Sequence, residues 1–186
     1  SAVRHNEKAD VDYIPADINL ANSETLMSTA LSRETILRRI LSEDNVKGYD
    51  FIIIDCLPSL STLLINALTA ADKVLIPVQS DYWAYEGVDQ LLATLQRVKT
   101  GDIRQYILGI LVTMFNKRTN SAKEIMSALT DSYKDFVFEN QIAYRDEVKV
   151  SSITHKSLVS QAKSVTGQQY MAVVDEIIER EENNNG

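Results

Sequence analysis

The sequence contains too little cysteine to build a disulfide framework or a cysteine-based metal centre. Its 186 residues include one cysteine and two histidines, which excludes an internal disulfide and leaves too few ligands for a zinc cluster. No apolar run reaches the roughly 18 residues that span a bilayer, and no basic segment followed by an apolar one marks a secretion signal. These absences exclude membrane-embedded and disulfide-stapled secreted proteins, and they predict a cytoplasmic location.

Positive charge is also scarce, because 19 lysines and arginines stand against 26 aspartates and glutamates, which gives a net charge of −7. This balance opposes wholesale attraction to nucleic acid but permits a local basic patch. The hydrophobic share of 45% is ordinary for a globular protein, and a chain of this length can bury a sizeable core. The chain starts with Ser-Ala-Val and no initiator methionine, which we interpret as a processed or engineered N-terminus.

Short apolar runs alternate with helical periodicity along most of the chain, which is the pattern of βαβ units around a parallel sheet. The runs expected to form strands are residues 11–15, 51–54, 74–78, 106–114 and 137–142. The run at 51–54 is continuously apolar instead of alternating, which indicates a strand buried on both faces.

Apolar residues at helical spacing predict helices between these strands. The stripes cover residues 26–31, 36–41, 63–71, 88–98, 125–129 and 171–178. Ser23 and Ser32 are the expected N-caps of the first two helices, and Gly48 is expected to end the second. We therefore predict a doubly wound α/β fold with a mostly parallel sheet, formed as one domain over residues 1–180 and followed by a disordered tail at 181–186.

Asp55 directly follows the run at 51–54, at the carboxyl end of the expected strand. Open parallel sheets bind ligands at that edge, where loops and helix N-termini converge. A carboxylate there can orient water on a Mg²⁺ ion that bridges nucleotide phosphates. An aspartate at a strand end can equally cap the next helix, so the spacing alone leaves both roles open.

The stretch around Asp55 resembles the ParA/MinD family of partition ATPases. Residues 49–60 read Tyr-Asp-Phe-Ile-Ile-Ile-Asp-Cys-Leu-Pro-Ser-Leu, which is similar to the segment that carries the family's Walker B aspartate and its switch loop. The similarity continues through residues 14–21, 64–72, 74–79, 82–92 and 111–120. It runs in order across most of the chain, from residue 11 to residue 178, and it implies a P-loop NTPase-like fold.

This resemblance implies ATP and Mg²⁺ as cofactors and gives roles to individual residues. Asp55 would support Mg²⁺ and the attacking water. Pro58 and Ser59 would belong to the switch loop that senses the γ-phosphate. Thr113 and Met114 would lie against the adenine, although packing at a strand end explains these two residues equally well.

The family's phosphate-binding loop is missing from the sequence. That loop is a glycine-rich turn ending in Lys-Thr or Lys-Ser, whose amides cradle phosphates at a helix N-terminus. None of the six glycines opens such a turn, and in the family the loop would lie well upstream of Val11. We therefore expect no ATP hydrolysis by this chain alone. The missing piece would also supply a central strand beside residues 51–54, so we expect either self-association through the gap or a rearranged sheet.

Members of the ParA branch bind DNA non-specifically, as dimers, through a basic surface near the C-terminus. The candidates for that surface are Arg145, Lys149, Lys156 and Lys163. Asp146 and Glu147 lie among them, so a solvated face of mixed charge is the alternative. The MinD branch ends in a basic amphipathic helix that lies on membrane, whereas residues 175–182 are mostly acidic, so we expect no membrane partner.

The resemblance thus predicts the C-terminal part of a partition ATPase that segregates a plasmid or chromosome. Such a protein would dimerise around ATP, associate with the nucleoid and work with a ParB-like centromere-binding protein. One alternative is a non-catalytic module that binds the partition partner or full-length subunits. The other is a MinD-like or related ATPase with a different cargo, for example in cofactor biosynthesis or polysaccharide export.

Overall fold

The structure is a computed structural model that describes residues 3–27, 29–42, 46, 48–57, 59–79 and 84–184. The chain divides into two compact units, Ser1–Ala71 and Asp72–Gly186. They are called the N-terminal unit and the C-terminal unit below. The expected single domain over residues 1–180 stays a prediction.

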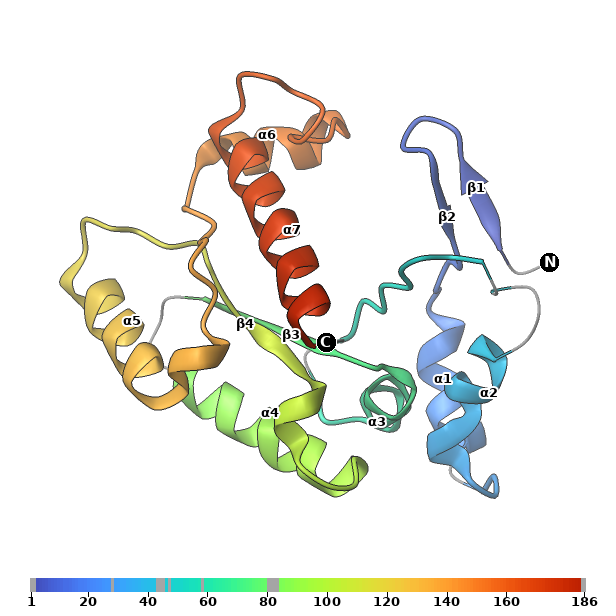
Figure 1. The fold of residues 1–186 in the computed structure, drawn as a ribbon. Helices are drawn as coiled ribbons and strands as arrows, with labels where there is room; N and C mark the ends of the chain where they lie inside the picture. Colours follow the sequence, from blue (N-terminus) through green and yellow to red (C-terminus); the bar gives the residue numbers. More distant parts are fainter. Residues whose placement is uncertain are drawn as a thin grey trace. The chain divides into compact units, whose positions relative to one another are not determined.

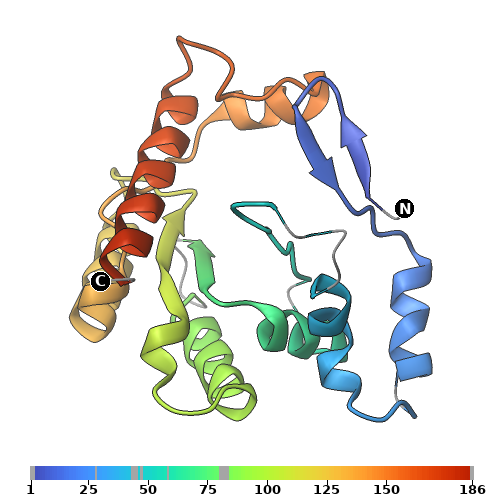
Figure 2. The ribbon, with the colours of Figure 1, turned by 45° about the vertical axis from the view of Figure 1, so that its right-hand side comes forward.

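The N-terminal unit contains a β-hairpin followed by short helices. Strand β1 (Arg4–Asn6) pairs antiparallel with β2 (Val11–Tyr13), and Figure 2 shows the hairpin leading into α1. The helical elements are α1 (Asn19–Met27), the 3₁₀ turn η1 (Arg33–Thr35), α2 (Ile36–Leu41) and α3 (Thr62–Ala70). The strand expected from residue 11 is therefore present, although it pairs with an N-terminal strand that the sequence did not predict.

Asn66 joins α3 to the start of α2. Its side chain is 3% exposed. It donates from Nδ2 to the carbonyl of Arg33 at 2.9 Å and accepts from the backbone N–H of Leu37 at 3.1 Å. The first N–H groups of a helix have no partner within the helix, so the Asn66 amide satisfies a donor that would otherwise be buried unpaired.

The expected strand at residues 51–54 is wrong for this structure. The segment is extended but belongs to no strand, and Phe51 and Ile53 are 60% and 91% exposed. A strand is held by hydrogen bonds to a neighbouring strand, and none of the strands in the described ranges pairs with residues 51–57. Without a neighbour, the continuously apolar run has nothing to bury against.

Two expected helix boundaries in this unit are also wrong. Ser23 lies inside α1, where its Oγ donates to the Asn19 carbonyl at 3.4 Å, so it does not cap a helix that begins later. Helix α2 ends at Leu41, well before Gly48. The apolar stripe at 36–41 coincides with α2, whereas the stripe at 26–31 overlaps α1 only at Leu26 and Met27.

The C-terminal unit is built on parallel pairing of β3 (Val74–Gln79) with β4 (Ile107–Thr113), and both strands were predicted. A third segment follows the other edge of β4. Phe138 donates its N–H to the Ile110 carbonyl at 2.9 Å, and Ile142 donates to the Val112 carbonyl at 3.0 Å. The expected last strand at 137–142 is therefore reduced to isolated parallel bridges, at Ile110–Val137 and Phe115–Ala143.

Helices cover both faces of this small sheet. Figure 1 shows α4 (Ala84–Val98) and α5 (Asn120–Tyr133) on one side and α7 (Val165–Asn184) on the other. The first interface buries Ile76, Val78, Ile110, Val112, Val88 and Leu129, whereas the α7 interface buries Leu111, Phe138, Ile142 and Val173. Alternate residues along each strand thus face opposite layers. The three-layer arrangement confirms the predicted α/β fold with a parallel sheet.

The remaining elements of this unit are short and connect its strands and longer helices. They are the 3₁₀ turns η3 (Ile103–Tyr106) and η4 (Lys134–Phe136) and the helix α6 (Asp146–Thr154). Helix α7 continues to Asn184, so residues 181–184 are helical and do not form the expected disordered tail. None of the helices in the described part of the chain combines the length and the apolar composition that a membrane crossing requires.

Replacing Asn66 tests how the N-terminal unit is held together. Asn66→Ala removes the hydrogen bonds that the Asn66 amide makes with the Leu37 N–H and the Arg33 carbonyl, which should destabilise the unit by about 1–3 kcal/mol. Urea denaturation followed by circular dichroism measures the change. Asn19→Ala is the matched control, because Asn19 is exposed on the first turn of α1. Equal stability of the two variants would contradict the assigned role.

Candidate functional site

The carboxyl end of β4 opens into a hollow of about 360 Å³, called the β4 hollow below. Its walls combine apolar side chains with amide side chains, among them Phe115, Ala143, Asn140, Gln141, Gln168 and Gln169. Amides offer both donors and acceptors. Apolar walls with a few converging polar groups are typical of small-molecule sites, and Lys117 and Glu139 add two charged residues to this lining.

Thr113 and Met114 end β4 beside this hollow. The Thr113 hydroxyl donates to the Val78 carbonyl at 3.1 Å, so it ties β4 to β3 at the edge where ligands bind in parallel sheets. Met114 has a φ of 52° and is half exposed. A residue with left-handed backbone angles cannot continue a strand, so the chain turns at Met114. Phe115 follows it and lines the hollow.

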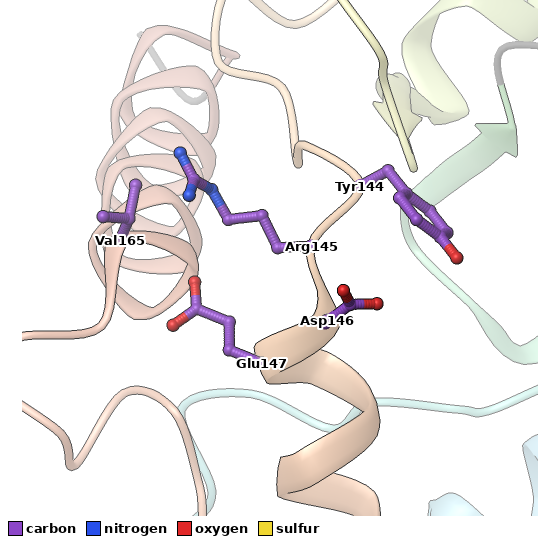
Figure 3. Close-up of a pocket in the computed structure, with 5 residues that line it drawn as sticks. All are labelled: Tyr144, Arg145, Asp146, Glu147 and Val165. Atoms are coloured by element: carbon purple, nitrogen blue, oxygen red, sulfur yellow. The ribbon is translucent and has the colours of Figure 1, made fainter.

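A second, shallower hollow of about 430 Å³ lies at the start of α6 and is called the α6 hollow. It is lined by Tyr144, Arg145, Asp146, Glu147 and Val165. Figure 3 shows the side chains of Arg145 and Glu147 extending toward the first turns of α7, whereas those of Tyr144 and Asp146 point the other way. Val165 lines both hollows, so the two sites adjoin at the N-terminus of α7.

Side chains of α7 hold the chain segment that forms the wall of the β4 hollow. Glu176 is 9% exposed. Its carboxylate accepts the backbone N–H groups of Glu139 and Asn140, both at 3.0 Å, and the Asn140 side-chain amide at 2.9 Å. Further along the wall, the Ala143 N–H donates to Gln169 Oε1 at 3.1 Å. These contacts supply hydrogen bonds that a regular strand would obtain from its ladder.

Arg180 completes the same cluster. Its guanidinium donates to Glu176 Oε1 at 2.8 Å and to the Val137 carbonyl at 2.9 Å. It also lies 4.2 Å from the centroid of the Phe138 ring, which is cation–π range. On β4, a Cβ at Gly109 would lie 2.4 Å from the Phe138 ring, so only glycine leaves room for that ring at this position.

The environment of Glu176 keeps its carboxylate charged. Burial alone would raise the pKa of Glu176, but the N–H groups of Asn140 and Glu139, the Asn140 amide and Arg180 together lower it below its ordinary value. The charged form is therefore the one that the fold stabilises.

The predicted Mg²⁺ ligand and switch-loop serine lie in the N-terminal unit. Asp55 and Ser59 are exposed, and the Ser59 N–H donates to the Leu57 carbonyl at 2.8 Å. Pro58 lies outside the described residues. Exposure leaves the Asp55 carboxylate accessible to a ligand, although the strand expected to present it is absent.

The residues around Asp55 suit magnesium only together with a phosphate ligand. In the ranges that the structure describes, no cluster of three or more histidine, cysteine or acidic residues could hold a metal ion. Mg²⁺ commonly binds through one or two carboxylates and completes its shell with waters and substrate phosphates. A single accessible carboxylate fits that mode and does not fit an all-protein cage.

The four candidate cations all lie in the C-terminal unit and are exposed: Arg145, Lys149, Lys156 and Lys163. Lys149 forms an ion pair with Asp146 at 3.3 Å and lies 5.3 Å from the centroid of the Tyr144 ring. The surface therefore mixes charges, as the sequence suggested. Their role in binding nucleic acid stays a prediction.

Comparison with known proteins decides the family. A family model described as "AAA domain" matches residues 1–107. Over 185 residues the chain is 38% identical to the "Chromosome-partitioning ATPase Soj" of Treponema pallidum, covering 97% of this chain and 72% of that protein. The chain belongs to the ParA/Soj family of partition ATPases.

Other ParA/Soj relatives agree with this assignment. The "Sporulation initiation inhibitor protein Soj" of Bacillus subtilis is 44% identical over 134 residues, which cover 72% of this chain and 53% of that protein. The chain thus spans only about half the length of this relative. Among solved structures, an ATP complex of McdA from Cyanothece superposes with a TM-score of 0.81 at 18% identity, over 95% of this chain and 69% of that one, which supports the P-loop NTPase-like fold.

Several residues that shape the site in this ParA/Soj chain were not found from the sequence. Glu147, Gln169, Glu176 and Arg180 all bind backbone or capping groups near the two hollows. One signal was present, because Glu176 and Arg180 are four residues apart on a helix, where side chains of opposite charge can pair. Their backbone partners come from a distant segment that no local pattern reveals.

The lowered pKa of Glu176 predicts how stability depends on pH. A carboxylate with a native pKa below its ordinary value of 4.5 contributes its full stability above that value and loses it as pH falls through the native pKa. The free energy of unfolding should therefore decrease on acidification below about pH 5, and it should decrease less steeply in Glu176→Gln.

Urea titrations at a series of pH values measure this difference. The exposed neighbour Glu179 provides the matched control, and Glu179→Gln should follow the parent protein. Parallel pH profiles for Glu176→Gln and the parent would show that the cluster does not depend on the charged carboxylate.

Proposed function

We propose that this chain is the C-terminal part of a DNA-partitioning ATPase that segregates a plasmid or chromosome through ATP-dependent dimerisation and DNA binding. The observation that carries the proposal is the family match together with the sequence around Asp55. The protein's partner would be a ParB-like centromere-binding protein, and its place the cytoplasm, in association with the nucleoid.

In this proposal the residues divide between three tasks. Asp55 holds Mg²⁺ through water and orients the attacking water, while Pro58 and Ser59 sense the γ-phosphate. Thr113 and Met114 border the adenine, which the β4 hollow receives through its amide and apolar walls. The magnesium ion, when bound with the nucleotide, neutralises charge on the phosphates.

Arg145, Lys149, Lys156 and Lys163 contact DNA phosphates in the third task. Contacts of this kind give non-specific binding that weakens steeply with salt. Support comes from the exposure of all four side chains, and Asp146 and Glu147 limit the net positive charge of the surface.

A second candidate function is a non-catalytic module that engages the partition partner or full-length subunits. The exposed apolar run at residues 51–54 supports it, because an extended segment without a strand partner can pair with another chain. A MinD-like membrane role is disfavoured by the acidic residues 175–182. A related ATPase with another cargo would share the fold and differ in its partner.

Adding a phosphate loop to the chain tests whether it is part of an ATPase or a non-catalytic binding module. We expect the chain alone to show no Mg²⁺-dependent ATP hydrolysis. Fusion of a relative's N-terminal segment, with its phosphate loop, ahead of residue 1 should restore hydrolysis, and Asp55→Asn in that fusion should abolish it.

A phosphate-release assay on the chain alone, the fusion and the Asp55→Asn fusion distinguishes the ATPase from the binding module. The Asp50→Asn fusion is the control, because Asp50 is the neighbouring exposed carboxylate and should tolerate the change. Hydrolysis that persists in the Asp55→Asn fusion would contradict the role of Asp55, and an inactive parent fusion would favour the binding module.

The exposed run at residues 51–54 also predicts self-association. An extended apolar segment without a strand partner exposes hydrogen-bonding groups that another chain can pair with. Sedimentation velocity of the chain should therefore show association that increases with concentration. Ile53→Lys should reduce it while changing the free energy of unfolding by no more than about 0.5 kcal/mol.

Leu31→Lys is the matched control for this experiment. Leu31 is 93% exposed and Ile53 is 91% exposed, both in the N-terminal unit, so general surface hydrophobicity would make the two variants equal. A strict monomer at high concentration, or equal effects of the two substitutions, would rule out pairing through residues 51–54.

A further inference from the structure

Helix α6 has no buried side chain with which to pack against the rest of the C-terminal unit. Glu147, Val148 and Ser151 are half-buried, and the other residues of the helix are exposed. A helix of 9 residues is too short to be stable by itself in water, and most helices in proteins are stabilised by packing of an apolar face. Helix α6 therefore depends on the few contacts that hold it to its neighbours.

The chain is fixed on both sides of α6. Before the helix, the Tyr144 N–H donates to the Phe115 carbonyl at 3.1 Å, just beyond the end of β4. After the helix, Leu158 is buried, and a Cβ at Gly167 would lie 2.3 Å from the Leu158 carbonyl oxygen. The backbone at Leu158 thus lies directly against the first turn of α7. Residues 145–157 form the segment between these two anchors, and we call this segment the strap.

Glu147 joins the strap to the N-terminal end of α7. Its carboxylate accepts the backbone N–H of Thr166 at 2.8 Å, the Ser164 hydroxyl at 3.0 Å and also the Thr166 hydroxyl. Ser164 Oγ in turn accepts the N–H of Gly167 at 2.9 Å. We call the contacts of Glu147 with these residues the Glu147 clasp. Among the described residues, the clasp supplies all the hydrogen bonds between the strap and residues 164–184.

The two neighbouring carboxylates of α6 differ in what they hold. Hydrogen bonds from the side chain and backbone N–H of Thr166 keep the pKa of Glu147 below its ordinary value, and a charged acceptor makes stronger hydrogen bonds than a neutral one. The Asp146 side chain points away from α7 (Figure 3), and its contact is the exposed ion pair with Lys149 within the same helix. Only Glu147 therefore links the strap to α7.

We propose that the strap opens as a separate unit between its anchors at Tyr144 and Leu158, and that the Glu147 clasp sets how often it opens. Because no side chain of α6 is buried, opening removes few apolar contacts, which is the property of segments that unfold locally. The inference does not depend on which ligand or partner the protein binds.

Opening of the strap changes both hollows of the C-terminal unit. The first residues of the strap and Val165 line the α6 hollow, so this hollow exists only while the strap is closed. Val165 also lines the β4 hollow, and it lies between the clasp residues Ser164 and Thr166. Release of the clasp therefore frees a residue that both hollows share, which makes the strap a conformational device next to the candidate site.

Native-state hydrogen exchange of the full chain measures the opening. The strap is followed by the amides of residues 150–154, which are hydrogen-bonded within α6. The reference amides are those of Phe138 and Ile142, which donate to carbonyls of β4. The strap amides should exchange faster than the reference amides. Low concentrations of urea should hardly change their exchange, because a local opening exposes little surface.

Glu147→Gln should speed exchange at residues 150–154 by about tenfold, because the clasp loses its charged acceptor, and should leave exchange at Phe138 and Ile142 unchanged. Asp146→Asn is the matched control, since it removes the same charge from the same turn of α6 and leaves the clasp in place. Its effect should be clearly smaller.

Thr166→Val tests the clasp from its other side. It removes the hydroxyl that donates to Glu147 and should speed exchange of the same strap amides. In the double variant with Glu147→Gln, the two effects should add up to less than their sum, because both substitutions act on the same contacts.

Three results would overturn the proposal. If residues 150–154 match the reference amides in rate and urea dependence, the strap opens only when the whole unit unfolds. If Glu147→Gln and Asp146→Asn have equal effects, the clasp does not control the opening. If Glu147→Gln also speeds exchange at Phe138 and Ile142, the clasp holds the whole unit and not the strap. The proposed function stands under each of these results, because it concerns nucleotide and DNA binding.

Discussion

In the described part of this chain, extended backbone forms a sheet only where its N–H and carbonyl groups pair with a neighbouring segment. Strands β3 and β4 obtain them from each other, and the segment at 137–142 obtains them partly from β4 and partly from α7. Among the described residues, the apolar run at 51–54 pairs with no strand, and Phe51, Ile52 and Ile53 are exposed. The need of backbone N–H and carbonyl groups for hydrogen-bond partners thus explains both the sheet of the C-terminal unit and the exposed segment that ends at Asp55.

The same need gives α7 its importance for the candidate site. Gln169, Glu176 and Arg180 replace part of a strand ladder with side-chain hydrogen bonds, and at the other end of the helix Glu147 and Ser164 satisfy its first N–H groups. One helix therefore supports the wall of the β4 hollow and is joined at its N-terminus to the first turn of α6. Under the proposed function, the nucleotide side and the DNA side of the protein share this helix.

The sequence was informative where the physics is local. Apolar spacing located α2, α3, α4, α5 and α7 but missed α6 and most of α1. The runs at 74–78 and 106–114 became β3 and β4, whose backbones pair with each other. The prediction of a strand at 51–54 was wrong for a non-local reason. A strand that is buried on both faces needs neighbouring strands and helices, and these come from other parts of the chain. The helix ends predicted at Ser23 and Gly48 were wrong, because apolar spacing does not determine where a helix begins or ends. The contacts of Glu147 and Gln169 were not predicted, because their partners lie at positions that only the fold brings together.

We expect residues 51–55 to form a strand when a neighbouring strand is available. Hydrogen exchange of the backbone amides of residues 52–54 tests this most directly, in the chain alone and in a fusion that adds a relative's phosphate-loop segment ahead of residue 1. Exchange should be rapid in the chain alone and strongly slowed in the fusion. Slow exchange in the monomeric chain alone, or no protection in a folded fusion, would contradict it.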